Sequence, residues 1–333
     1  MAKGLNEISS IADAIDAAME CSQVDSWSFD PLETAIAPYY KLPFGIWYRG
    51  QASADWDIMP SVFRPDSKGK YYDETSLFFH FQLRSPSFRS EHHSMFEWLC
   101  LMQHYDAPTR LLDWTESVLI ALYFTVSDPE QERFDGALFA LNARLLNLDS
   151  DIERRTGKRP GIHVPTSFNT VLRALMAGYR ELSEIFYSRA LDHLDETDSP
   201  EVTVLEELKQ SALAGSFGWG VSADAKKFLE HMVKPVAVYP YRTNSRLLAQ
   251  AGTFTIHGGK IYHTKDGYKN PYPAGPIVLN HRDSASFLKK YVIPRAAKQK
   301  LRRELEVAGI HKGTLFPELD KQSEYMRDVW RAE

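Results

Sequence analysis

Residues 103–115 read QHYDAPTRLLDWT, a motif that the apolar run Val118 to Val126 follows closely. The motif gathers a histidine, an arginine, aspartates, a tryptophan and two threonines around one proline. A core segment does not need so many hydrogen-bonding side chains, because every buried polar group must find a partner. The motif therefore predicts either a turn with a polar purpose or one wall of a pocket.

The end of this motif has the form of a capping box, because Glu116 follows Asp113 by three residues. It predicts a buried helix from Thr115 to Val126, with Asp113 as the N-cap. A buried strand stays an alternative, because so short an apolar run has no decisive periodicity. A helix N-terminus suits an anion, which makes Thr109, Arg110 and Asp113 candidates for binding one. Alternatively, Asp113 only caps the helix and Arg110 pairs with an acid.

Two further motifs lie upstream and downstream. Residues 47–51 read WYRGQ, in which Arg49 offers a fork for phosphate or carboxylate. Gly50 lets a ligand or a second backbone approach closely. Arg49 has a structural alternative, as a buried arginine paired with Asp113. Gln250 precedes the expected strand Gly252 to His257, where it can position a ligand or make an edge hydrogen bond, but it cannot transfer a proton.

Three aromatic residues of these motifs have both a functional and a structural interpretation. His104 is a candidate general base or ribose-hydroxyl partner, and equally a structural histidine with satisfied hydrogen bonds. Tyr48 and Trp114 have rings that could stack on a flat ligand such as nicotinamide or adenine, although core aromatics are far commoner. The sequence leaves both interpretations open for each of them.

Periodicity predicts the remaining elements and an α+β fold, because short strands alternate with helices without a βαβ pattern. Helices are expected at residues 8–22, Tyr71 to Arg84, Ser94 to Tyr105 and, opened by Pro294 and closed by Gly309, as a last helix. Extended segments are expected at Ile46 to Arg49, Ile58 to Arg64, Gly136 to Asn142, Val236 to Tyr239, Gly252 to His257 and Phe287 to Ile293.

The order of these expected helices and strands divides the chain into four regions. An N-terminal helical cap occupies residues 1–30, and the core has a first part at 31–143 and a second part at 233–333. Between them, residues 144–232 are polar and read as a mainly helical insertion. Its expected helices are Thr166 to Tyr187 and Val202 to Leu213. Nothing in the sequence indicates an oligomeric state.

Composition excludes several classes of protein. A net charge of −5 argues against a nucleic-acid binder that uses its whole surface. Cys21 and Cys100 have no metal-type spacing, and Glu91, His92 and His93 lack a third distant ligand, so no metal is expected. The chain shows no secretory signal at Met1 to Ser10 and no apolar run long enough to span a bilayer. We therefore expect a cytoplasmic protein without membrane contact.

Taken together, the motifs resemble the FRG-domain family. Members of that family typically read YRGQ, then QHYGAPTRLLDWT, then AQQGxFTxHG, and they close on LFPDLDG. Here residues 48–51 read YRGQ, residues 249–258 read AQAGTFTIHG and residues 315–320 read LFPELD. The resemblance extends from residue 44 to residue 322.

The order of the motifs is also similar to that of ADP-ribosyltransferases. That resemblance implies small mixed or antiparallel sheets in an ADP-ribosyltransferase-like core, with NAD as a substrate. In that family a first-strand Arg or His grips NAD, and a hydroxyl-bearing segment before a buried helix shapes the nicotinamide-ribose pocket. A late-strand Glu holds the ribose and stabilises the cationic transition state. The resemblance assigns these roles to Arg49, to Thr109 through Thr115, and to the position of Gln250.

Gln250 departs from this plan, because an amide supplies no negative charge to a developing cation. Either Asp113 or another acid supplies that charge, or turnover is slow, or the protein binds without reacting. The catalytic residues implied are Arg49, Asp113 and Gln250. The residues implied to bind NAD are Tyr48, Gln51, His104, Thr109, Arg110 and Trp114.

The function implied is an NAD-using ADP-ribosyltransferase-like enzyme or NAD hydrolase. It would act as a bacterial toxin or anti-phage effector that modifies a protein or nucleic acid. The alternative is a non-catalytic sensor that binds a nucleotide or a phage component in the same pocket. A third hypothesis is a nucleic-acid binder that uses the basic residues near the C-terminus, namely Lys289, Lys290, Arg295, Lys298, Lys300, Arg302 and Arg303.

Overall fold

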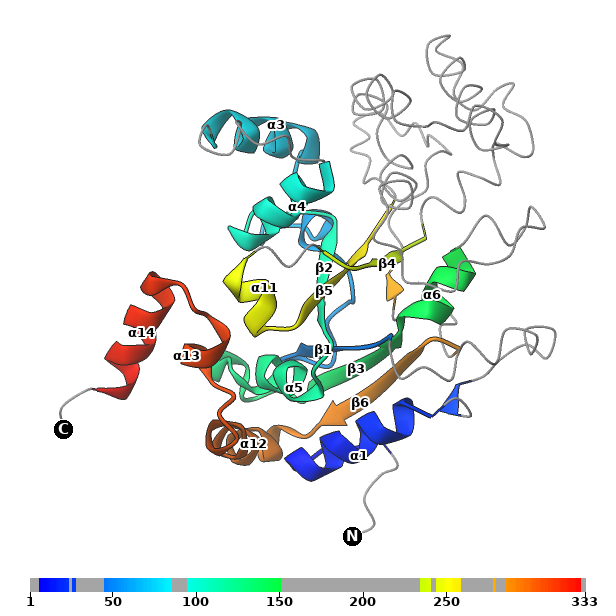
Figure 1. The fold of residues 1–333 in the computed structure, drawn as a ribbon, viewed down its shortest axis with the longest axis vertical. Helices are drawn as coiled ribbons and strands as arrows, with labels where there is room; N and C mark the ends of the chain where they lie inside the picture. Colours follow the sequence, from blue (N-terminus) through cyan, green and yellow to red (C-terminus); the bar gives the residue numbers. More distant parts are fainter. Residues whose placement is uncertain are drawn as a thin grey trace.

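The computed structural model describes residues 6–23, 26–27, 45–85, 95–150, 234–240, 244–258, 278–279 and 286–330 (Figure 1). These residues form helices around a six-stranded antiparallel sheet of order β4-β5-β2-β1-β3-β6. The expected α+β class is confirmed. The strands are β1 (Ile46–Gln51), β2 (Leu111–Thr115), β3 (Gly136–Asn142), β4 (Val236–Val238), β5 (Gly252–Ile256) and β6 (Leu288–Ile293). The expected helices Thr166 to Tyr187 and Val202 to Leu213 lie outside the described residues, as do Glu91, His92 and His93.

The sheet is divided between β1 and β2. These two strands share one register pair, Tyr48 with Thr115, whereas β1 pairs with β3 over its whole length and β2 pairs with β5 over its whole length. Beyond that pair, Arg49 to Gln51 of β1 and Leu111 to Asp113 of β2 are no longer joined by a ladder. The sheet therefore opens at the point where two of the sequence motifs face each other.

Three helices cover the β1-β3-β6 half of the sheet. They are α1 (Ile11–Cys21), α5 (Val118–Val126) and α12 (Arg295–Val307), which Figure 1 shows gathered at one end of the molecule. The largest apolar cluster joins them to β1, β3 and β6. The C-terminus of α12 is closed as expected: Gly309 has φ +78°, and the N–H of Ile310 donates to the carbonyl of Leu305 at 2.8 Å.

The β4-β5-β2 half of the sheet carries a second layer, formed by α3 (Glu74–Arg84) and α4 (Met95–His104). One face of α4 is apolar and packs on the sheet: Phe96, Leu99 and Met102 lie in a cluster with Leu111 of β2 and Phe254 of β5. This packing fixes the end of α4, and with it His104, above the opening in the sheet.

Helix α6, which follows β3, contacts the residues that lead into β4. Asn147 of α6 (Ala143–Ser150) both donates to and accepts from the backbone of Ala237, at 3.0 and 2.7 Å. The Ser150 hydroxyl donates to the carbonyl of Pro235 at 2.6 Å. The chain therefore leaves the core at Ser150 and re-enters it at an adjacent point.

The predicted start of the buried helix is wrong. Residues 111–115 form β2, and α5 begins at Val118 with Ser117 as its N-cap, whose hydroxyl accepts from the N–H of Ile120 at 3.4 Å. Asp113 therefore lies in the middle of a strand and caps no helix. Its spacing to Glu116 matches a capping box, but pairing of β2 with β5 outweighs that local signal.

Two other expectations are corrected near the ends of the core. The segment Ile58 to Arg64, expected to be extended, contains the 3-10 turn η3 (Ser61–Phe63). The helix opened by Pro294 is not the last, because α13 (Lys312–Leu315) and α14 (Leu319–Val329) follow it. None of the helices in the described ranges is long and apolar enough to cross a membrane.

A backbone strain at Ala251 leads to a stability prediction. Ala251 follows α11 (Ser245–Ala249) and has φ +45°, a left-handed conformation that costs a residue with a Cβ about 1–2 kcal/mol. Glycine lacks this cost but loses more entropy on folding. We expect Ala251→Gly to raise the free energy of unfolding by about 0.5–1 kcal/mol, measured by chemical denaturation. An equal or lower stability would show that Ala251 is unstrained.

Candidate functional site

A pocket of about 380 Å³ lies where β1 and β2 separate. Its walls come from both strands, the loop that follows β1, the C-terminal end of α4, helices α5 and α11, and Phe316 after α13. Elements far apart in the sequence therefore contribute to one cavity. The pocket is open to solvent on one side, and its lining is rich in charged groups.

Asp113 lies on the β2 side of this pocket and is held by a hydrogen-bond chain. Gln103 Nε2 donates to Asp113 Oδ2 at 2.7 Å, and Oε1 of the same side chain accepts from the Thr109 hydroxyl at 2.5 Å. The Thr109 hydroxyl oxygen in turn accepts from the N–H of Leu111 at 3.1 Å. Asp113 is exposed as a residue, and its carboxylate lies in the recess of the pocket, where neighbouring protein atoms partly remove it from water. This enclosure raises the pKa of Asp113, and the nearby Arg49 and the Gln103 hydrogen bond only partly offset it.

Arg49 reaches the same space from β1. Its Nη1 donates to the backbone carbonyl oxygen of Asp113 at 2.6 Å. Nε of Arg49 is buried and has no hydrogen-bond partner. Burial lowers the pKa of Arg49 to about 10, and repulsion from Arg64 acts in the same direction, whereas Asp113 opposes the shift. Within the described ranges, Arg49 forms no ion pair within 4 Å, so its guanidinium keeps donors for a ligand.

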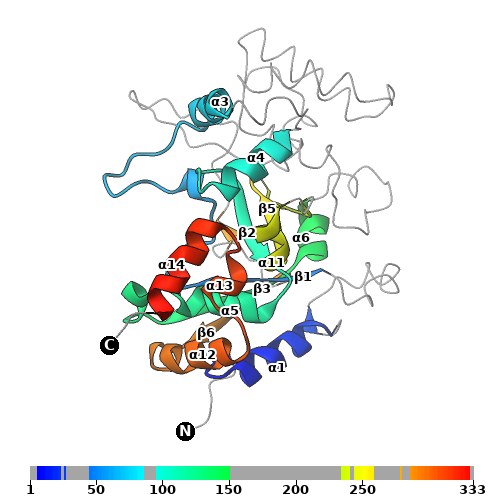
Figure 2. The ribbon, with the colours of Figure 1, turned by 60° about the vertical axis from the view of Figure 1, so that its left-hand side comes forward.

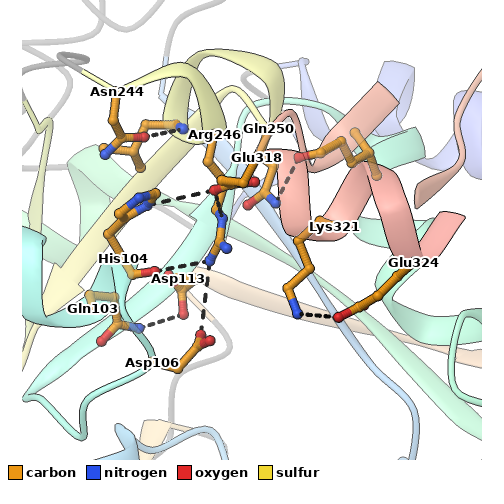
Figure 3. Close-up of polar contacts among 12 residues, drawn as sticks. Gln103, His104, Asp106, Asp113, Asn244, Arg246, Gln250, Glu318, Lys321 and Glu324 are labelled. Carbon is orange, nitrogen blue, oxygen red and sulfur yellow. Dashed lines mark hydrogen bonds and ion pairs between the residues drawn. The ribbon is translucent and has the colours of Figure 1, made fainter. Parts of the chain in front are cut away.

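A second charged group lies on the α11 side of the pocket (Figure 3). Arg246 donates from Nε to Glu318 at 2.5 Å and from Nη1 to the carbonyl of His104 at 3.1 Å. Asp106 lies 3.9 Å from the same guanidinium, and the Phe316 ring lies under it at 5.5 Å. Arg246 is thus committed to the protein and joins the end of α4 to the C-terminal segment.

His104 belongs to this group, with its Nδ1 3.9 Å from Glu318. Partial burial lowers the pKa of His104, and the positive charge of Arg246 lowers it further. A neutral imidazole is therefore favoured, which can accept a hydrogen bond from a ligand hydroxyl. In Figure 3, Glu318 lies between His104 and Arg246.

Gln250 forms the corner between α11 and β5. Its Nε2 donates to the carbonyl of Leu315 at 3.1 Å, and its own backbone carbonyl accepts from the Thr115 hydroxyl at 2.7 Å. Figure 2 shows the consequence, in that α13 lies next to α11. The amide lines the pocket, and it also fastens the C-terminal segment to it.

Arg49, Gln51, His104, Asp113 and Gln250, all expected from the sequence, line this pocket together. The expected residues Tyr48 and Trp114 also contribute to its lining. Thr109 and Arg110 do not line it; both are fully buried. Arg110 donates to both carboxylate oxygens of Glu74 at 2.9 Å and to the carbonyl of His257 at 2.8 Å. The structure therefore shows the alternative for Arg110, an arginine paired with an acid that fastens α3 to the sheet.

The two aromatic residues expected to stack on a ligand, Tyr48 and Trp114, touch the pocket but are mostly buried in the core. Trp114 is 3% exposed and donates its indole N–H to the Thr255 hydroxyl at 3.0 Å. Tyr48 is 7% exposed, belongs to the apolar cluster beneath α5, and has its pKa raised by burial. Trp56, which lines the pocket and is 44% exposed, has a ring that is available to a ligand.

Sequence reasoning missed five residues of the site. Phe316 and Glu318 belong to the closing LFPELD motif, whose resemblance to the family was the available signal. Arg246 lies just before the motif at residues 249–258, and nothing in the sequence marks it beyond its charge. Trp56 and Arg64 lie in a loop without any motif. In the part of the chain that the structure describes, no three metal-binding side chains come together.

Comparison with known proteins finds a match over one part of the chain. Residues 45–133 match the family model of the FRG domain. Searches of curated proteins and of solved structures found no match. The matched range contains Arg49, Trp56, Arg64, His104 and Asp113. The α11 side of the pocket and its C-terminal segment come from residues beyond the matched range.

Proposed function

We propose that this FRG-domain protein, with its domain at residues 45–133, is an NAD-using ADP-ribosyltransferase-like enzyme that acts on a macromolecule. One observation carries the proposal: Arg49 on β1, Asp113 on β2 before the buried helix α5, and Gln250 before β5 all line one pocket. These are the three places where the motif order places the NAD-binding and catalytic groups of that enzyme class. Sequence order alone does not bring them together.

The proposed reaction breaks the bond between the nicotinamide nitrogen and C1′ of the ribose. Nicotinamide leaves with the bonding electrons, and a nucleophile of the acceptor, or water, attacks C1′ and gives up a proton. Arg49 would bind the diphosphate through its free guanidinium donors. Asp113 would face the positive charge that develops on the ribose, which is the task that Gln250 cannot perform.

The proposal is tested by incubating the pure protein with NAD and a cell lysate. Nicotinamide is followed by chromatography, and acceptors are followed by the mass increase of an attached ADP-ribose. We expect nicotinamide release with labelled acceptor, or release alone if water is the acceptor. A toxin or anti-phage role follows if the labelled acceptor is essential to the host or comes from a phage. No release by a folded protein would sink the enzymatic proposal.

Replacement of Asp113 separates catalysis from stability. Its folded-state pKa is raised above the unfolded value, so the ionised carboxylate costs stability at pH 7, and this cost disappears as acid protonates it. We expect Asp113→Asn to lower nicotinamide release by about 100-fold. The same variant should unfold at a higher temperature than the native protein at pH 7, and this advantage should shrink toward pH 4.

A matched control for this variant is Asp128→Asn. Asp128 also lines the pocket, and its carboxylate caps the turn η5 (Pro129–Gln131), a role that asparagine fills equally well. We expect nearly native nicotinamide release from it. Equal losses in the two variants would mean that any carboxylate at the pocket serves, and the specific role of Asp113 would be wrong.

A second candidate function is a non-catalytic sensor that binds a nucleotide. Gln250 favours it, because the amide offers no charge and is already tied to Leu315. Such a protein would be stabilised thermally by NAD without releasing nicotinamide. The same incubation with NAD therefore distinguishes the two functions.

The nucleic-acid hypothesis loses much of its basis in the structure. Lys298 is buried and donates to the carbonyls of Ala52 and Gln131 at 2.6 and 2.8 Å. Arg302 donates to the carbonyl of Val126 and lies 2.7 Å from Glu132. Charges committed to the fold add little to phosphate binding, so the enzyme and the sensor remain the two proposals.

A further inference from the structure

The loop after β1 forms a fixed wall of the pocket. Gln51 donates to the carbonyl of Asp57 at 3.2 Å, and the N–H of Ala54 donates to the carbonyl of Asp135 at 2.7 Å. Lys298 and Lys290 each donate to the loop backbone, at Ala52 and Ala54. The loop carries Trp56 and leads to Arg64, and both side chains line the pocket. A wall held at this many points is organised before any ligand arrives.

Arg64 is a second cation in the pocket with donors to spare. Its Nε and Nη2 both donate to the carbonyl of Met59, at 2.8 and 2.5 Å, and Nη1 has no partner among the described residues. Unlike Arg246, it makes no ion pair within the described ranges. The Met59 carbonyl fixes the direction of the guanidinium without neutralising its charge.

Arg49 and Arg64 each contribute a cation to the lining of the pocket, which also contains Arg246 and three aspartates. Burial lowers the pKa of both, Asp113 opposes this in each, and the repulsion between the two guanidiniums lowers the pKa of Arg49 further. Asp113 acts on both cations, and Asp57 also acts on Arg64. An anion with two charges placed between them would relieve their repulsion and use the donors that the protein leaves free.

Two other groups on the same side of the pocket suit the rest of a nucleotide. Trp56 is 44% exposed, whereas Trp47 and Trp98 are buried. Gln51 lines the pocket and is 3% exposed, and its buried side-chain Oε1 has no hydrogen-bond partner among the described residues. A half-exposed indole can stack on a base, and a buried amide oxygen without a donor can accept from a sugar hydroxyl.

We propose that this wall binds a nucleoside diphosphate group, with the diphosphate between Arg49 and Arg64 and the base against Trp56. The inference rests on the proposed function, since it names the part of NAD that this side of the pocket holds. It goes further in one respect: the ligand class is defined by residues of the loop after β1, and the nicotinamide end is not needed for binding.

The test uses ADP and inorganic pyrophosphate as probes, with binding to the full chain measured by calorimetry. We expect Arg64→Ala to weaken both probes by about tenfold or more, because a charge-assisted contact is lost. Trp56→Ala should weaken ADP by about tenfold and leave pyrophosphate unchanged, because only ADP has a base to stack. Arg64→Lys, which keeps the charge without the fork, should bind pyrophosphate with intermediate affinity.

Matched controls come from α14 and the residue that follows it, outside the pocket. Trp330→Ala and Arg327→Ala remove the same side-chain types from exposed positions and should bind both probes as the native protein does. Native affinity for ADP in both Trp56→Ala and Arg64→Ala would overturn the inference, even if NAD is consumed. Conversely, ADP binding that depends on Trp56 and Arg64, without nicotinamide release, would uphold it and refute the enzymatic proposal.

Discussion

Gly50→Ala is expected to lower the free energy of unfolding by about 3 kcal/mol or more. A Cβ at this position would lie 1.8 Å from the backbone carbonyl oxygen of Ala121 and 2.4 Å from the Thr125 hydroxyl oxygen. The first of these atoms belongs to the backbone of α5 and cannot rotate away. The methyl group fits only if α5 moves off the sheet, which also disturbs the apolar cluster beneath it. Denaturant unfolding followed by circular dichroism measures the loss.

The control is Gly69→Ala. Gly69 has φ +75° and no atom within 4 Å of a built Cβ, so alanine adds conformational strain without a clash. About 1 kcal/mol is the expected loss there. If both variants lost the same small amount, α5 would not lie as close to β1 as the structure has it.

The clash at Gly50 also answers a question that the sequence left open. The glycine after Arg49 was expected to let either a ligand or a second backbone approach, and the structure shows a second backbone, that of α5. Because α5 packs closely on Gly50, it fixes the position of the neighbouring Arg49 beside the opening between β1 and β2. The glycine thus serves the site through packing.

Local sequence patterns predicted most elements of the fold, but not how they combine. Short, mostly apolar segments gave β3, β4 and β5 to within a residue or so, and Pro294 and Gly309 set the limits of α12. The same kind of reasoning failed at Asp113. Whether residues 111–115 form a strand or lead into a helix depends on pairing with residues 252–256, more than a hundred positions away, and no local pattern contains that information.

The candidate site shows a similar limit. Arg49 and Arg110 have comparable motif contexts, yet Arg49 lines the pocket while Arg110 is fully buried against Glu74. Arg110 is buried because α3 places Glu74 beside it, and the sequence around Arg110 does not reveal that position of α3. Asp106 illustrates the reverse case: it stands where the family pattern has glycine, and its φ of +57° explains why glycine is common there. A motif indicates a backbone requirement or a site, and the fold determines which.

The Arg49→Ala variant is expected to lose nicotinamide release by about 100-fold or more while keeping its fold. The reason lies in the contacts of the side chain. Its one hydrogen bond goes to the backbone carbonyl of Asp113, its Nε has no partner, and its burial lowers its pKa to about 10. The folded protein therefore gains little from this charge, and its loss removes repulsion with Arg64. A melting temperature within a few degrees of the native value is expected, because the variant loses one hydrogen bond and at the same time removes a partly desolvated charge.

Arg110→Ala is the comparison that gives this result its meaning. It removes the same side chain from the neighbouring motif, but it leaves the carboxylate of Glu74 buried without its cation, which costs about 3–5 kcal/mol. The two arginines should therefore separate cleanly: one variant stable and inactive, the other unstable from the start. Should Arg49→Ala also unfold, Arg49 would be a structural residue, and the charge at the opening of the sheet would belong to the fold. If instead it stays folded and still releases nicotinamide, the pocket between β1 and β2 is not where NAD reacts.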